Sequence, residues 1–180
     1  RALAIACAAE GMRLALLDLK LETLQQTAEL IDGNTECLLQ VCDVTQGEAV
    51  EQAANAVYDR FGATHLLFNN AGVFTGGPMW QTPTAEWRRQ FDVNVMGVVH
   101  GLRSFVPRMI EGGVEGHIVN TASVGGLTSP PHYSAYSATK HAVVALTECL
   151  HHDLNEVTDR IGASVLCPAF VKTAIADDTA

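Results

Sequence analysis

Segments with the apolar pattern of β-strands alternate along the whole chain with segments of helical spacing. The strand-like segments are short and apolar, and they cover residues 13–18, 36–41, 65–69, 116–121 and 163–167. The helical segments cover residues 1–10, 21–31, 45–61, 82–109 and 136–154. This alternation is typical of a parallel sheet with helices on both faces. The sequence therefore predicts an α/β fold with a doubly wound parallel sheet, in a single domain over residues 1–180.

Local signals mark several of the element boundaries. Gly11 follows the first helical segment, where a left-handed residue is wanted. Thr45, with Glu48 three residues later, matches a capping box at the start of a helix. Thr82, followed by Pro83, reads as another helix start.

Charge and hydropathy narrow the class of partner. The 180 residues carry a net charge of -9, whereas nucleic acids and anionic membranes bind basic surfaces. No apolar run approaches the ~20 residues needed to span a bilayer, and no signal peptide is visible. We expect a cytoplasmic protein with neither a nucleic acid nor a membrane as partner.

The cysteines and histidines do not form ligand patterns. The five cysteines include no CxxC pair, which favours buried small side chains in a reducing compartment. The seven histidines show no HxH or HExxH spacing. We therefore expect no metal site.

Polar residues follow the ends of most strand-like segments. They are Asp18, Asp43, the run Asn69–Gly72, Ser123 and the run Pro168–Thr173. Ligands of doubly wound folds bind beyond the carboxyl ends of the strands, so these residues are expected to share one site. Two further candidates, Asn94 and Tyr136, lie on helices and would reach in from them.

Tyr136 and Lys140 are four residues apart on a predicted helix and therefore project from the same face. An ammonium group beside a phenol favours the phenolate, which lowers a tyrosine pKa from its usual value of about 10. The pair thus has the form of a proton-transfer device. This spacing also arises by chance on helices, so its weight comes from the surrounding motifs.

The order and spacing of these motifs resemble the classical type of short-chain dehydrogenase/reductase. The resemblance is carried by Asn69-Asn70-Ala71-Gly72, Asn94, Ser123, the Tyr136–Lys140 pair and the segment from Pro168 to Thr173, and it runs from residue 1 to about Thr173. It implies a Rossmann-like fold. It also implies an oxidoreductase of the alcohol dehydrogenase or carbonyl reductase type, which exchanges a hydride between NAD(P) and a small alcohol or carbonyl.

The resemblance assigns four catalytic roles. Tyr136 is the general acid/base, and Lys140 lowers the Tyr136 pKa and holds the nicotinamide ribose. Ser123 donates a hydrogen bond to the substrate oxygen, with a plain turn serine as the alternative. Asn94 relays protons to Lys140 through a water, with a helix-bending buried asparagine as the alternative.

Residues nearer the N-terminus are implied to bind the adenosine half of the cofactor. A carboxylate at Asp18 can accept hydrogen bonds from the ribose hydroxyls of NAD and would repel the extra phosphate of NADP. NAD is therefore favoured, although Lys20 keeps NADP open. Asp43 and Val44 are implied to contact the adenine, and a turn leading into Thr45 is the alternative for Asp43.

Two further segments are implied to line the cofactor. Asn70, Ala71 and Gly72 lie along it, and Gly72 permits close backbone approach. In the family this segment also stabilises the central sheet. Pro168 and Thr173 follow the last strand, and Thr173 contacts the nicotinamide carboxamide or, alternatively, serves as a turn or capping residue.

The chain departs from the family pattern at both ends. The glycine-rich phosphate turn with its strand and the C-terminal substrate segment are not seen, so the fold is expected to be incomplete at both ends. The missing strand predicts a gap in the sheet between the strands beginning at Arg13 and His65.

Helix 136–154 is apolar over more than one stripe, which favours a homo-oligomer, a dimer or tetramer. Two other functions stay open: a nucleotide-binding relative without turnover, and an extended-type sugar-nucleotide epimerase or dehydratase.

Overall fold

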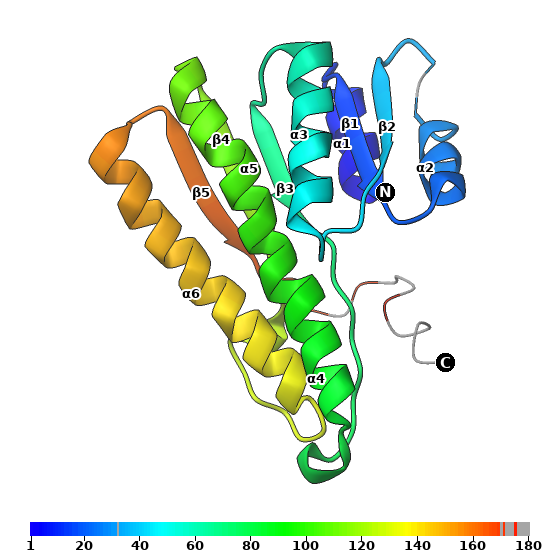
Figure 1. Cartoon of the computed structure of the whole chain (residues 1–180), viewed down its shortest axis with the longest axis vertical. Coiled ribbons are helices and arrows are strands. Elements are labelled where there is room, and N and C mark those ends of the chain that lie inside the picture. The colour runs from blue at the N-terminus through cyan, green and yellow to red at the C-terminus, as the bar shows by residue number, and fades with distance from the viewer. Residues whose placement is uncertain (32, 170, 172–174, 176–180) are drawn as a thin grey trace.

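Five parallel strands form two sheets in the computed structural model, which describes residues 1–31, 33–169, 171 and 175. One sheet contains β1 (Leu14–Asp18) and β2 (Cys37–Val41). The other has the order β3-β4-β5, with β3 at Leu66–Asn69, β4 at Gly116–Thr121 and β5 at Ile161–Leu166. Parallel strands alternate with helices, so the predicted α/β class is confirmed (Figure 1).

Six α-helices connect and cover the strands of the described chain. They are α1 (Ala2–Ala9), α2 (Leu21–Ala28), α3 (Gly47–Phe61), α4 (Thr84–Phe91), α5 (Gly97–Gly112) and α6 (Ser134–Val157). In Figure 1, α1 lies behind β1 whereas α3 lies in front, so helices cover both faces. Short 3-10 helices occur at Met79–Gln81 (η1) and Val124–Gly126 (η3). None of the helices in the described residues is both long and apolar enough to cross a membrane.

A gap separates β1 from β3. Among the described residues β1 pairs with β2 alone and β3 with β4 alone, so one edge of each strand lacks a ladder partner. The predicted interruption of the sheet at this place is confirmed. Backbone N–H and C=O groups on such edges lose hydrogen bonds that a neighbouring strand would supply.

One hydrophobic core joins the two sheets across this gap. Its buried members come from α3, α5, β4, α6 and β5 and from Cys42 just after β2, and they include Ala53, Phe105, Met109 and Ile118. Ala15 and Leu17 of β1 and Leu38 of β2 pack against the same cluster. Helix α3 therefore holds the β1–β2 sheet to the larger sheet by side-chain packing.

The predicted helix 82–109 is continuous but contains a wide turn. A π-helical segment, η2 (Asp92–Met96), joins α4 to α5, and the Gly97 amide donates to the Asp92 carbonyl five residues earlier. Such π-turns are rare and occur often at functional sites. Asn94 is the buried residue of this turn.

Two predicted helix starts are wrong in detail, whereas Gly11 takes the predicted left-handed conformation with φ 76°. Helix α3 begins at Gly47 with no side-chain cap, because the Thr45 amide and hydroxyl both donate to Asp43 Oδ1, at 2.9 and 2.8 Å. Helix α4 begins at Thr84, and the Thr82 hydroxyl donates to the Pro78 carbonyl. In both cases a local turn takes the side chain that would have capped the helix.

Candidate active site

The side chains of Tyr136 and Lys140 leave α6 one turn apart and meet at the end of β4. Lys140 Nζ donates to the carbonyl of Thr121, the last residue of β4, at 2.8 Å. The same nitrogen lies 5.7 Å from the centroid of the Tyr136 ring. Lys140 is only 2% exposed. The spacing of four residues therefore places both groups on one face, as predicted.

Ser123 lies beside the Tyr136 phenol. It follows β4 directly and caps η3, where its hydroxyl accepts a hydrogen bond from the Gly125 amide at 3.1 Å. A β-carbon at Gly125 would lie 3.3 Å from Tyr136 Cε1 and 3.6 Å from Ser123 Oγ. The glycine thus leaves room for the tyrosine ring to approach the serine.

Burial sets the protonation of both ionisable groups. It raises the pKa of Tyr136 above its ordinary value, and the nearby Tyr133 adds to this, although a hydrogen bond with Ser123 acts in the opposite direction. Burial lowers the pKa of Lys140 to about 8, and the interaction with Cys167 partly offsets this. The net pKa of Tyr136 is raised because removal of the phenol from water outweighs the other influences, and the lowering of this pKa by Lys140 stays a prediction.

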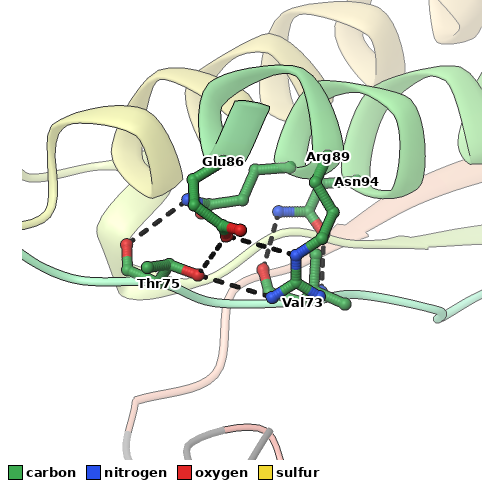
Figure 2. Close-up of polar contacts among 6 residues, drawn as sticks. Val73, Thr75, Glu86, Arg89 and Asn94 are labelled. Atoms are coloured by element: carbon green, nitrogen blue, oxygen red, sulfur yellow. Dashed lines mark hydrogen bonds and ion pairs between the residues drawn. The ribbon is translucent and has the colours of Figure 1, made fainter. Parts of the chain in front are cut away.

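Asn94 holds the chain segment that follows β3. Its Oδ1 accepts from the Val73 amide at 2.8 Å, and its Nδ2 donates to the Val73 carbonyl at 3.0 Å (Figure 2). Nδ2 also donates to Thr139 Oγ1 of α6 at 3.0 Å. With 0% exposure, Asn94 ties α6, the wide helical turn and the segment after β3 together.

Asn94 and Lys140 approach each other across Gly72. A β-carbon at Gly72 would lie 3.4 Å from Asn94 Oδ1 and 3.4 Å from Lys140 Nζ. The backbone at this glycine therefore passes directly beside both side chains. Asn70, two residues earlier, accepts from the Thr121 hydroxyl at 3.2 Å, while Ala71 is exposed.

The two acidic residues predicted to bind the adenosine half lie at or just after the ends of β1 and β2. Asp18 is the last residue of β1 and is exposed, and its carboxylate accepts from the Lys20 amide at 3.2 Å. Asp43 is partly buried and follows β2, where it accepts from Thr45. Both carboxylates are therefore near the carboxyl ends of parallel strands, where ligands bind in such folds.

Val44 is held by two residues of α5 that sequence reasoning did not assign. The Val44 carbonyl accepts from His100 Nδ1 at 2.8 Å. A β-carbon at Gly97 would lie 2.9 Å from Val44 Cγ2, so a larger residue there would displace the valine. Gly97 and His100 are three residues apart and share a helix face, which is the pattern that links them.

The C-terminal candidates are placed only in part. The Val124 amide of η3 donates to the carbonyl of Pro168 at 2.9 Å. Because Val124 directly follows Ser123, this bond holds Pro168 close to Ser123. Thr173 lies outside the described residues. Ser123, Tyr136, Lys140, Asn94 and Gly72 form one neighbourhood, whereas Asp18, Asp43 and Val44 lie near the ends of β1 and β2.

A hollow of about 620 Å³ opens beside the start of α6, and none of Ser123, Tyr136 and Lys140 lines it. Its lining is mostly apolar and contains Met79, Trp80, Trp87, Pro130, Pro131 and His132. Within the described ranges, no group of three His, Cys, Asp or Glu side chains is arranged to hold a metal ion.

The chain is similar to known proteins along its whole length. A family model described as short chain dehydrogenase matches residues 1–180. The crystal structure of a short chain dehydrogenase/reductase from Burkholderia phymatum in complex with NAD has a TM-score of 0.96 and 48% identity, over 98% of this chain and 63% of that one. An alcohol dehydrogenase from Thermococcus sibiricus, complexed with 5-hydroxy-NADP, has a TM-score of 0.87 and 27% identity, over 96% and 72% of the two chains.

A curated relative gives the same result at the level of sequence. The "CLA biosynthesis dehydrogenase/reductase" of Lactiplantibacillus plantarum is 34% identical over 164 residues. The match covers 91% of this chain and 57% of that protein, so the present chain spans less than two thirds of the relative's length.

Proposed function

Because this chain belongs to the short-chain dehydrogenase family, we propose that its protein is an NAD(P)-dependent oxidoreductase that interconverts a small alcohol and a carbonyl compound. The observation that carries this proposal is the arrangement of three side chains at the end of β4. Ser123 lies beside the Tyr136 phenol, and the Lys140 ammonium lies over its ring. Residues 1–180 contribute as a single domain.

Each of these residues has a role that its contacts support. The Tyr136 phenol exchanges the proton of the substrate hydroxyl, and the neighbouring Ser123 hydroxyl donates a hydrogen bond to the substrate oxygen. A raised Tyr136 pKa keeps the phenol protonated at neutral pH, which favours proton donation to a carbonyl. This protonation state fits the direction in which a carbonyl is reduced.

The residues present also fit a bound nicotinamide dinucleotide. Lys140 Nζ uses one of its N–H groups on Thr121 and keeps others to donate to a ribose hydroxyl. Gly72 offers a close backbone approach beside that nitrogen. When bound, the cofactor supplies the hydride chemistry, and the protein supplies position and electrostatics. Asn94, beside Lys140 across Gly72, is proposed to link the lysine to solvent through water.

We propose NAD as the preferred cofactor. Asp18 is exposed at the end of β1, where its carboxylate can accept hydrogen bonds from ribose hydroxyls and would repel a 2′-phosphate. The similar protein from Burkholderia phymatum was solved with NAD, which supports the same preference. Lys20, also exposed, is the group that would favour NADP instead.

The protein is further proposed to be a cytoplasmic homo-oligomer, a dimer or tetramer, with a small molecule as substrate. Along α6, Val143 is fully buried, while Ala145 and Cys149 are exposed on another side of the helix. Exposed apolar side chains such as Trp80 (86%) and Met79 (60%) lie next to the hollow at the start of this helix. These exposed apolar side chains on and near α6 support pairing with a second copy.

The test of the function uses the protein as its gene encodes it. A panel of alcohols and carbonyl compounds is screened for formation or consumption of NADH and NADPH, with wild type, Tyr136→Phe and Tyr58→Phe compared. Tyr136→Phe should lose nearly all turnover while still binding cofactor. Tyr58→Phe is the matched control, because Tyr58 lies on α3 and packs against Phe105. Retained turnover in Tyr136→Phe would contradict the proposed role.

A further inference from the structure

The segment Val73–Thr75 is held by side chains of α4 and η2. It has no regular secondary structure, so its backbone groups need partners outside a sheet or helix. Asn94 takes both the amide and the carbonyl of Val73. Gln90, four residues earlier in the helix, donates from Nε2 to the Thr75 carbonyl at 3.3 Å. Two amide side chains thus hold this segment at both of its ends.

A third contact fixes the Thr75 side chain. Its hydroxyl donates to Glu86 Oε2 at 2.8 Å, and the guanidinium of Arg89 reaches the same hydroxyl at 3.4 Å (Figure 2). Glu86 and Arg89 also form an ion pair at 3.2 Å. Helix α4 therefore holds Thr75 in two ways. Gln90 binds its backbone carbonyl, and the Glu86–Arg89 pair binds its hydroxyl.

Phe74 lies between Val73, which Asn94 of η2 holds, and Thr75, which α4 holds. Its ring meets the Tyr136 ring edge-on, with centroids 5.1 Å apart and an interplanar angle of 87°. It also lies 5.0 Å from the Tyr133 ring. Edge-to-face contact at this distance is a favoured aromatic geometry. Any shift of Val73 or Thr75 would move the Phe74 ring relative to the Tyr136 phenol.

The Gln90 amide is costly to bury, so the hydrogen bond that it makes to Thr75 points to a role for this side chain. Gln90 is 0% exposed, and its Oε1 has no hydrogen-bond partner among the described residues. A buried unpaired acceptor costs roughly 1–3 kcal/mol, which an apolar side chain of similar size would avoid. What the amide provides and an apolar side chain cannot is the hydrogen bond to Thr75.

We propose that Gln90 and the Glu86–Arg89 pair are positioning residues of the active site, which act through Thr75 to hold the Phe74 ring against Tyr136. The Phe74 ring forms an apolar wall beside the phenol and keeps water from that side. The proposal rests on the proposed function in one respect, that Tyr136 is the residue that exchanges the proton. Sequence reasoning missed Gln90, although its spacing of four residues from Asn94 was a usable signal.

Few ionisable groups surround the phenol within the part of the chain that the structure describes, so its titration reports on the Phe74 wall. Lys140 faces the Tyr136 ring from α6, and Tyr133 stands near the start of the same helix. From η3 and its cap the neighbours are Ser123 and Gly125, which carry no charge. Glu86 and Arg89 of α4 contact Thr75. Of the three tyrosines, all of which the structure describes, only Tyr136 contacts both the Phe74 ring and the Lys140 ammonium.

The first experiment measures the phenol without needing turnover. Ultraviolet difference titration of each protein against its Tyr136→Phe counterpart isolates the Tyr136 phenol. Phe74→Leu and Gln90→Met should each lower the Tyr136 pKa toward the ordinary value of about 10, because water reaches the phenol. Thr75→Val removes the hydroxyl held by Glu86 and Arg89 and should act in the same direction, which gives a second test if Gln90→Met does not fold.

The second experiment separates positioning from general stability. Gln90→Met should lower kcat on the order of ten-fold with little change in the KM for cofactor, and adding it to Phe74→Leu should change kcat no further. The control is Arg108→Met on α5, which removes the contacts of Arg108 with Glu51 and Asn55 of α3. It should lower the unfolding temperature and leave the Tyr136 pKa unchanged.

The outcomes distinguish this proposal from the proposed function. An unchanged Tyr136 pKa in Gln90→Met and Thr75→Val, or effects of Gln90→Met and Phe74→Leu that simply add, would overturn the positioning role. Absence of any cofactor-dependent turnover in wild type would overturn the function instead, and the phenol titration would still decide whether α4 holds the Phe74 wall.

Discussion

The Lys140 ammonium lies over the face of the Tyr136 ring, 5.7 Å from its centroid, and donates to the Thr121 carbonyl. Its position over the ring, and its bond to a backbone carbonyl, keep the ammonium at the end of β4. Burial makes this location unfavourable for a charge, since it lowers the Lys140 pKa to about 8. The protein thus carries a cation that costs stability at neutral pH.

Stability should therefore increase as the pH rises through the range in which Lys140 loses its proton. The folded-state pKa of about 8 lies below the ordinary value of 10.5, so the unfolded chain binds more protons between these values. The free energy of unfolding then rises with pH in this window, by on the order of 3 kcal/mol in total. Denaturant titrations at several pH values measure it.

The control for this pH dependence is Lys140→Met, which should be more stable than wild type at pH 7 and should lack the rise. Tyr136 has a raised pKa and contributes the opposite slope at higher pH, so both proteins are best compared in a Tyr136→Phe background. A wild-type stability that falls steadily from pH 8 upward would contradict the prediction.

Asp18→Ala should weaken NAD binding and improve NADP binding relative to it. Removal of a carboxylate that accepts hydrogen bonds from ribose costs roughly ten-fold in affinity or more. Fluorescence titration of the gene-encoded protein with NADH and NADPH measures both. Asp59→Ala is the control, since Asp59 is an exposed aspartate of α3. If wild type already binds NADPH far more tightly than NADH, the reading of Asp18 is wrong.

Gly101→Ala should destabilise the end of β3. A β-carbon at this position would lie 2.1 Å from Asn69 Oδ1, and Asn69 donates to Asn120 Oδ1 at 2.8 Å. The added methyl group must push the Asn69 amide away, at an expected cost of roughly 1–3 kcal/mol. Gly112→Ala on the same helix meets nothing within 4 Å and should be close to neutral. Equal unfolding temperatures for the two variants would refute the argument.

Residues 1–180 expressed alone should bind NAD weakly and exchange amide hydrogens quickly along β1 and β3. Each of these strands has an edge without a ladder partner among the described residues, whereas β4 is paired on both sides. Hydrogen exchange followed by mass spectrometry should therefore protect β4 more than β3. Tight, saturable binding of NADH by this piece would show that the unpaired edges matter little.

The sequence predicted the strands and helices because each has a local periodicity, but it could not predict features that depend on tertiary contacts. The Tyr136–Lys140 geometry follows from helical spacing alone. The wide turn at Asn94 does not follow from helical spacing. It goes with the hydrogen bonds between Asn94 and Val73, which lie 21 residues apart in the sequence. The raised Tyr136 pKa was also missed, because burial is a property of the packed molecule.

Smaller errors have the same origin. Thr45 and Glu48 match a capping box in sequence, but the Thr45 hydroxyl donates to Asp43 instead of capping the helix. The strand predicted from Ala163 begins at Ile161, because the ladder with β4 extends to Gly116. Neither competing partner is visible in the local pattern that was used.

The π-turn at Asp92–Met96 makes the number of residues in this helix as important as their identity. Before it, Gln90 faces the segment after β3, and beyond it Gly101, Phe105 and Met109 are buried. A wide turn absorbs one residue more than an α-helical turn for about the same rotation, so the faces before and after it stay in register. Loss of one residue from the regular part of α5 would rotate everything beyond it by about 100°. Loss of one residue from the wide turn itself would instead let it close as an ordinary α-helix, which keeps the buried face but removes the bulge that presents Asn94 to Val73.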